Sequence, residues 1–512
     1  MANMTTLEFG AWEPDAALLN GLQAPEACNV IPEKRGYRPV PAIEVGKYEA
    51  LPGAALEVYA SKDMADNMAT LAATSDGIYA MEWDEDEQKF TWVQRYAVTP
   101  LTESRYFAQY GDAVYALWGT QLLKQASPGT NFEPVTQAEG YDYDAPAGEV
   151  MGTIRDFLVI GQLTGDPAAI QWSGIDRPDE WPTPGTNAAQ YIQSDTQVFP
   201  VGGRVMSIVG AVGGVDGLIF QERAIQRATY VGPPYIMQFN PVDQQQGTVA
   251  GKSPTVCGTV CFFLAEDGWK ATDGASVRPV GYERVDRWFF NQCDTARIAE
   301  VRGVHDSAHR LAVWSFPTSA ASAGVHDRLL IYSYTLDKWS YVKCSIECLF
   351  GDISRGVTLE ELDELMPQAV PVEDGGIDTP RPPRPFASMD SDALKNGARL
   401  LGIVDDAHRM GSFTGAPMQA MIETAEHGGA RMMVHGFRPL VDCGDAQARP
   451  IWRVVQRNQR NYGKYTRQAR RDGICYHHLS CDYVAAGILI PEGEDWHHAV
   501  AVEGVIEEEG GL

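Results

Sequence analysis

The chain has 512 residues, with 68 acidic and 41 basic side chains and a formal net charge of −27. So large a negative charge repels nucleic acid and anionic membranes, which excludes a general sequence-reading DNA-binding protein but not one that merely lets DNA pass. The 50 glycines, 31 prolines, 21 tyrosines and 12 tryptophans favour turns and aromatic strands over long helices, and predict a mainly β protein of two or more domains or of one large repeat architecture.

The N-terminal segment, residues 1–48, has repeated prolines and no long periodic run. Such a segment cannot build a core of its own, so we predict an extended arm that lies across a neighbour. The segment also lacks the basic and apolar regions of a signal peptide, and the nine cysteines include no CxxC pair. Reduced thiols in a cytosolic assembly compartment are expected.

Between residues 49 and 356, polar turns repeatedly precede apolar or aromatic strands. In residues 262–281 the pairs Asp267-Gly268 and Asp273-Gly274 separate three short strand-like runs, and Asp-Gly is a strong hairpin signal because it tolerates positive φ. Similar segments recur at intervals near the roughly 40–50 residues that a four-stranded propeller blade needs. We therefore predict a β-propeller-like domain of four-stranded blades, with unrelated hairpins in sandwiches as the alternative. The other segments are residues 75–83, 111–124, 155–163, 216–232 and 309–316.

The rest of the chain is predicted in three parts. Residues 357–386 hold a capping-box pattern for a short helix, followed by a proline-rich linker. Residues 387–431 predict a β-meander that could close the propeller. Residues 432–512 predict a C-terminal β-sandwich or small barrel domain. No apolar run approaches the roughly 20 residues that a membrane-spanning helix needs.

The densest metal-like cluster is Cys475, His477, His478 and Cys481. On a strand His478 points away from the other three, whereas Zn²⁺ needs converging ligands, so these are expected to be ordinary strand residues. His497-His498 diverge in the same way. Nucleophile-elbow and phosphate-binding glycine motifs are missing from the sequence. We predict no catalytic residue, metal or cofactor, although a pair of glycosidase carboxylates in distant loops stays open as an alternative.

One segment departs from the acidic background, because it holds eight cations and no acid. This basic strip could contact DNA phosphates, or it could dock on the acidic surface of an adjacent copy. Docking on a copy is favoured because a chain of net charge −27 supplies its own partner. The cations of the basic strip are Arg449, Arg453, Arg457, Arg460, Lys464, Arg467, Arg470 and Arg471.

Several segments, in this order, resemble the tail nozzle or hub proteins of short-tailed bacteriophages, also described as packaged-DNA stabilisation proteins. The resemblance implies a non-enzymatic homohexameric tube in the virion tail, assembled in the host cytoplasm, through which the genome leaves. The segments are LNGLQAPEACNVIPEKRGYRP near the start, QWSGIDRPDEW at 171–181, FFLAEDGWKATDGASVRPVG followed by VDRWFF, LLIYSYTLDKWSYV at 329–342, and ILIPEGEDWHHAVAVEGV near the end.

The resemblance also implies partners: a portal-side adaptor ring, tail fibre or spike proteins, and transient non-specific DNA in the lumen. Trp12, Asn29 and Tyr37 of the arm are the residues that we expect to contact the adaptor or a neighbouring subunit. The basic strip would then act as a clasp between subunits or as a brake on DNA. Two other functions stay open, a carbohydrate-binding or carbohydrate-cleaving propeller of a phage tail and a cytosolic propeller scaffold.

Overall fold

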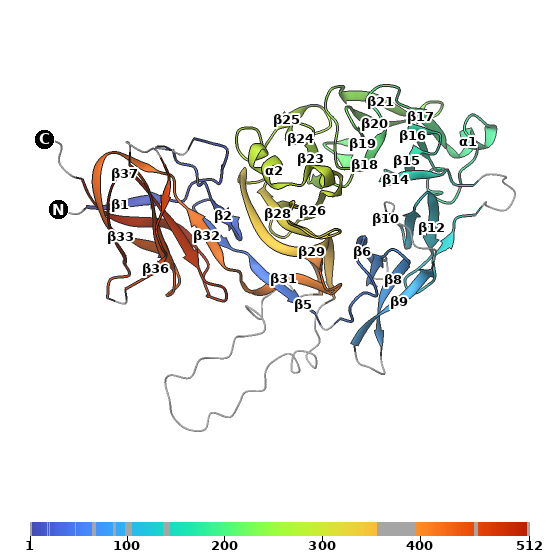
Figure 1. Cartoon of the computed structure of the whole chain (residues 1–512). Helices are drawn as coiled ribbons and strands as arrows, with labels where there is room; N and C mark the ends of the chain where they lie inside the picture. Colours follow the sequence, from blue (N-terminus) through green and yellow to red (C-terminus); the bar gives the residue numbers. More distant parts are fainter. Residues whose placement is uncertain are drawn as a thin grey trace.

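The computed structural model describes residues 3–17, 19, 21–46, 48–63, 68–84, 89–97, 105–136, 144–355, 396–454, 459–469 and 471–508. The predicted helix and proline-rich linker at 357–386 lie outside these residues. The protein is mainly β, with a ring of four-stranded sheets at one end and a long curved sheet at the other, beside both termini (Figure 1).

Five four-stranded antiparallel sheets follow one another along the chain. Blade 1 is β6 (Glu57–Lys62), β7 (Met68–Ala73), β8 (Gly77–Asp84) and β9 (Lys89–Ala97), and blade 2 is β10 (Arg105–Tyr110), β11 (Ala113–Trp118), β12 (Gln121–Gln125) and β13 (Glu133–Pro134). Blade 3 is β14 (Gly148–Ile154), β15 (Phe157–Leu163), β16 (Asp166–Trp172) and β17 (Asp195–Val198), and blade 4 is β18 (Val205–Val212), β19 (Val215–Gln221), β20 (Ile225–Gly232) and β21 (Ile236–Asp243). Blade 5 is β22 (Thr255–Cys257), β23 (Val260–Ala265), β24 (Gly268–Thr272) and β25 (Val277–Pro279).

Blades 6 and 7 share one long strand, β29 (Lys338–Arg355). Blade 6 is β26 (Arg302–Asp306), β27 (Leu311–Phe316), β28 (His326–Ser333) and the first half of β29. From residue 346 onward β29 pairs with β30 (Asn396–Asp405), which pairs with β31 (Met410–Pro417), which pairs with β5 (Pro41–Val45). The described residues therefore form seven blades, and a strand from the N-terminal segment completes the last one.

The ring closes where blade 7 meets blade 1. Leu51 and Val58 at the start of blade 1 share one buried apolar cluster with Phe350, Val404 and Met410 of blade 7. Burial of apolar surface is the main stabilising term in such a seam. The predicted meander, residues 387–431, supplies two of these side chains.

The C-terminal domain is built on one antiparallel sheet in the order β1–β38–β33–β37–β34. Its buried face holds Val434, Phe437 and Trp496. Whether the domain is a sandwich or a barrel stays a prediction. Its strands are β1 (Asn3–Glu8), β32 (Ala420–Glu423), β33 (His427–Val441), β34 (Gln447–Arg453), β35 (Asn461–Tyr462), β36 (Thr466–Arg467), β37 (Cys475–Ile490) and β38 (Ala499–Glu508).

The N-terminal segment joins the two ends of the molecule. β2 (Ala27–Cys28) pairs with β32 of the C-terminal domain and, at Cys28, with β29 of blade 6. β3 (Val30–Pro32) pairs with β4 (Tyr37–Pro39), and β4 meets β38. The segment is extended, as predicted, but it lies across the two domains of its own chain.

The predicted hairpins of residues 262–281 are confirmed as β23 to β25. Gly268 has φ +137°, and a Cβ there would collide with the carboxylate of Asp286, so glycine is required at this turn. Asp286 begins helix α2 (Asp286–Gln292), and its Oδ1 accepts a hydrogen bond from the Trp269 amide at 3.0 Å. Burial raises the pKa of the Asp286 carboxyl to about 6. The remaining helices are α1 (Asn187–Ile192) and a 3-10 helix (Thr295–Glu300).

Candidate functional site

The described cations of the basic strip lie on β34 and β36 and in the segments beside them, and three of the arginines pair with two glutamates of the same domain. Glu423 contacts Arg449 at 2.7 Å and Arg460 at 3.1 Å. Glu426 contacts Arg453 at 2.6 Å and Arg460 at 3.0 Å. We call these five residues the junction network.

Burial makes the junction network an internal structure. The side chains of Glu423 and Glu426 are only 6% and 1% exposed, and that of Arg460 is 16% exposed. A carboxylate this deeply buried loses most of its hydration, which several charged contacts must replace. Each glutamate receives two guanidinium groups, so Arg449, Arg453 and Arg460 are occupied inside the chain.

A cleft of about 420 Å³ opens beside the junction network, between the two domains and the N-terminal segment. Tyr341 of blade 6 donates a hydrogen bond to Glu26 of the N-terminal segment, and burial raises the pKa of the Glu26 carboxyl. The guanidinium of Arg449 lies 4.9 Å from the ring centre of Tyr462 and 4.7 Å from that of Tyr465. The cleft is therefore a place where three separate segments meet around paired charges.

The remaining cations of the basic strip do not belong to the junction network. Lys464, Arg467 and Arg471 are exposed. Arg457 and Arg470 lie outside the described residues. A contact of these cations with a second copy or with DNA stays a prediction.

The arm residues Trp12, Asn29 and Tyr37 require a correction. The Trp12 side chain is 0% exposed and packs against Trp288, with ring centroids 4.8 Å apart. Asn29 is buried, donates to the Gln419 carbonyl at 2.8 Å and accepts from the Lys343 amide at 2.9 Å. Tyr37 is buried and donates to the Gly10 carbonyl. The prediction that these side chains contact an adaptor or neighbour is wrong, because they are enclosed by their own chain.

The cysteine and histidine cluster lies on β37. Cys475 and Cys481 are buried, whereas His477 is half-buried and approaches the Thr466 hydroxyl at 3.0 Å and the Ala448 carbonyl at 3.1 Å. Burial raises the pKa of Cys475 to about 11 and of Cys481 to about 12. In the part of the chain that the structure describes, no three metal-ligating side chains come together.

Another charged cluster links the first strands of several blades. Glu57 of β6 pairs with Lys252 and, at 3.3 Å, with Arg302 of β26. Arg302 also donates to the Leu56 carbonyl and the Cys348 sulfur, both at 2.7 Å. The Lys252 ammonium lies 5.1 Å from the ring centre of Tyr106 on β10. These contacts join blades 1, 2, 6 and 7.

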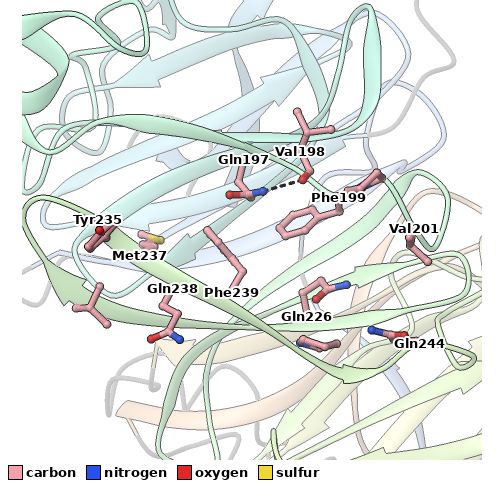
Figure 2. A pocket seen from close by; sticks show the side chains of 13 residues that line it. Gln197, Val198, Phe199, Val201, Gln226, Tyr235, Met237, Gln238, Phe239 and Gln244 are labelled. Atoms are coloured by element: carbon pink, nitrogen blue, oxygen red, sulfur yellow. Dashed lines mark hydrogen bonds between the residues drawn. The ribbon is translucent and has the colours of Figure 1, made fainter.

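A groove of about 740 Å³ opens on the rim of blades 3 and 4, and we call it the rim groove (Figure 2). One wall is β17 with the loop after it, and the other wall is β20 and β21. None of the described lining residues is charged. They are Gln197, Val198, Phe199, Pro200, Val201, Gln226, Val231, Tyr235, Met237, Gln238, Phe239, Pro241 and Gln244.

Sequence reasoning missed the rim groove. Its glutamines and apolar residues come from three separate stretches, and each stretch alone is an ordinary strand or loop. The available signal was the lack of charge in TQVFPVGG, residues 196–203, within a strongly charged chain. That signal identifies a surface only after two blades are placed side by side.

Comparison with known proteins finds structural similarities at low identity, and no protein family and no curated protein matches the sequence. The WD40 domain of Neurospora crassa Pan2 is similar in structure, with a TM-score of 0.37, 9% identity and coverage of 75% of this chain and 97% of the other. A putative gluconolactonase gives a TM-score of 0.32 at 11% identity, covering 56% of this chain and 94% of the other. The exo-β-1,3-galactanase of Phanerochaete chrysosporium gives 0.24 at 8% identity, covering 89% and 100%.

The chain is therefore a β-propeller protein with a C-terminal β region. This assignment depends on the strand pairings, because similarities at such low identity and TM-score carry no argument about function. The search for membrane-crossing helices finds none among the described residues.

Proposed function

We propose that this chain is a structural subunit of the tail nozzle or hub of a short-tailed bacteriophage. It forms a ring, a homohexamer, that retains packaged DNA and conducts it out during ejection. The subunit is not an enzyme, and it holds no cofactor. Its partners are an adaptor ring, tail fibres or spikes, and the passing DNA.

The junction network is the observation that supports this proposal best. Glu423, Glu426 and their three arginines lie where the propeller, the N-terminal segment and the C-terminal domain meet. Paired buried charges fix one geometry, because any other arrangement leaves a charge without a partner. A conduit subunit needs such a fixed angle between its domains, since every copy in a ring must present the same surfaces.

The charge of the chain agrees with a DNA conduit. At a net charge of −27 the surface repels phosphate groups over a distance of roughly 10 Å at moderate salt. Binding by counterion release would slow the passage of DNA, so a wall of negative charge keeps friction low. Arg449, Arg453 and Arg460 offset this effect little, because they are already paired with Glu423 and Glu426 inside the chain.

Most of the segments that carry the resemblance form strands and turns of the two domains. Residues 262–281 form β23 to β25, residues 329–342 form the β28–β29 hairpin, and residues 488–505 form the end of β37, the loop after it and the first part of β38. The first segment includes β2 to β4, which join the two domains. The resemblance therefore concerns the framework of both domains.

Virus particles assembled with and without the chain test the proposal. Particles that lack it should lose their genome, measured as nuclease-sensitive DNA, and purified chain added afterwards should restore protection. A chain carrying Glu426→Ala, which breaks the junction network, should restore protection poorly. Full genome retention in particles without the chain would overturn the proposal.

A carbohydrate-binding propeller is the second candidate, and the rim groove favours it. Four glutamine amides can donate and accept hydrogen bonds with sugar hydroxyls, and Tyr235 and Phe239 offer aromatic surface. Incubation of the purified chain with host capsule or lipopolysaccharide tests this function. Saturable binding that Tyr235→Ala abolishes, or release of oligosaccharide, would favour it over the nozzle.

A further inference from the structure

The rim groove is uncharged and partly apolar, although the chain is strongly acidic. Its described lining is uncharged, and it exposes several large apolar side chains. Val198 is 43% exposed, Val201 61%, Val231 47% and Tyr235 79%. A concentration of exposed apolar residues marks an interaction surface, because water contact with it is unfavourable.

Backbone groups of the groove wall already have hydrogen-bond partners in neighbouring side chains. The Thr196 amide donates to the Asp195 carboxylate at 2.9 Å, and the Val198 carbonyl accepts from the Gln197 side chain at 2.7 Å (Figure 2). A peptide that added to β17 as a further strand would have to break such bonds. The groove is therefore suited to receive side chains.

A second uncharged surface lies elsewhere on the same chain. Residues 16–25, AALLNGLQAP, contain no charge, and the structure exposes Leu19 by 46% and Leu22 by 78%. We call its described residues, 16, 17, 19 and 21–25, the leucine loop. The loop lies beside the C-terminal domain, because Leu19 bridges Glu426, and its end bridges back from Ala24 to Trp12.

The backbone of the leucine loop packs against the chain at Leu22. A Cβ at Gly10 would collide with the Leu22 carbonyl, so the backbone of the loop rests directly on residue 10. The Leu22 amide also donates to the Gln23 side chain at 3.0 Å. A preorganised loop loses little conformational entropy when it binds.

We propose that the rim groove receives the leucine loop of a second copy of this chain. This inference rests on the proposed ring and names the contact that closes it. Two copies, each of net charge −27, repel one another where their acidic surfaces face, which favours contact through uncharged surfaces. The two surfaces differ, so the contact is head-to-tail, the arrangement that generates a closed ring when the rotation between copies is right.

Charge placed on either surface tests the contact. Tyr235→Glu in the groove and Leu22→Glu in the loop should each convert rings to single chains, and raise the apparent dissociation constant at least about tenfold, because a buried charge stays unpaired. Mass photometry across a dilution series measures this shift. Tyr476→Glu, which adds the same charge at an exposed tyrosine outside both surfaces, should leave the rings intact.

Opposite charges placed on the two surfaces together test whether the groove and the loop contact each other. A chain with both Tyr235→Arg and Leu22→Glu should assemble again, because each contact between copies then holds opposite charges. Thermal unfolding of each variant confirms that the subunit is folded. Recovery in the double variant supports the proposal even if one single variant is destabilised.

The outcomes separate this inference from the proposed function. If the wild-type chain forms rings and both single-charge variants form them equally well, the groove-and-loop contact is wrong and the nozzle proposal stands. If the wild-type chain stays a single particle, both are overturned. Binding of dextran or of a host polysaccharide in the groove of intact rings would also overturn the contact.

Discussion

The junction network and the rim groove use polar side chains in opposite ways. The junction network is charged and buried, and its carboxylates are 6% and 1% exposed. The rim groove is uncharged and open, and its tyrosine is 79% exposed. Charges that face one another inside the chain fix its shape, whereas an uncharged open surface is free to bind a partner.

In the proposed ring, this difference would let so acidic a chain assemble with itself. Three arginines of its basic strip are paired with Glu423 and Glu426 within the subunit, so they are occupied there. Association then depends on apolar burial, which like charges elsewhere on the surface oppose and salt screens. The following predictions test whether the two regions are as different in energy as they are in structure.

The largest effect is expected in the junction network. Glu426→Ala removes a buried carboxylate from Arg453 and Arg460, and should lower the free energy of unfolding by about 4–5 kcal/mol in urea denaturation. Glu8→Ala is the matched control, because its partner Arg35 is 74% exposed and such pairs contribute at most about 1 kcal/mol. Equal effects of the two substitutions would contradict the distinction.

Trp12 tests whether the N-terminal segment is part of the junction. Trp12→Ala removes a fully buried ring that packs on Trp288 and Tyr341, and should cost about 3–4 kcal/mol of unfolding free energy. Trp83→Ala, at a ring that is 44% exposed, should cost clearly less. A Trp12 variant that is as stable as the wild type would show that the segment is a detachable arm.

Asp286 gives a pH-dependent prediction beside the N-terminal segment, whose Asp15 carboxylate accepts the amides of Arg287 and Trp288. Burial raises the folded-state pKa of Asp286 from 3.8 to about 6, so the folded chain binds more protons between these values and its stability falls as the pH rises through them. Asp286→Asn removes this term. The variant should gain on the order of 1–3 kcal/mol over the wild type above pH 6 and lose the gain near pH 4. A gain independent of pH would refute the assignment.

The smallest effect on stability is expected in the rim groove. Tyr235→Ala should change the free energy of unfolding by less than about 0.5 kcal/mol, because the side chain is largely in water. The same substitution should weaken assembly measurably. A large loss of stability would show that Tyr235 supports the fold and is not held ready for a partner.

The blades were predictable because their signals are local. The Asp-Gly turns at residues 267–268 and 273–274 alternate with apolar runs, and each hairpin follows from residues close in sequence. The completion of blade 7 was not predictable. β5 has five residues and pairs with β31 some 370 positions later, and nothing local in Pro41–Val45 indicates that partner.

The pairing of the basic-strip arginines was also not predictable, because it depends on contacts between segments that are separate in the sequence. The strip shows eight cations and no acid along the chain, yet Glu423 and Glu426 reach three of them from neighbouring strands. Which carboxylate faces which guanidinium depends on the pairing of β37 with both β32 and β34. Sequence shows an excess of charge, whereas strand register decides where the charge is neutralised.

Electron microscopy of the purified chain tests the central claim most directly. We predict closed rings with a central opening, in which blades 3 and 4 of each subunit meet the leucine loop of the next. A single particle that does not associate, with a polysaccharide bound in the rim groove, would contradict the account.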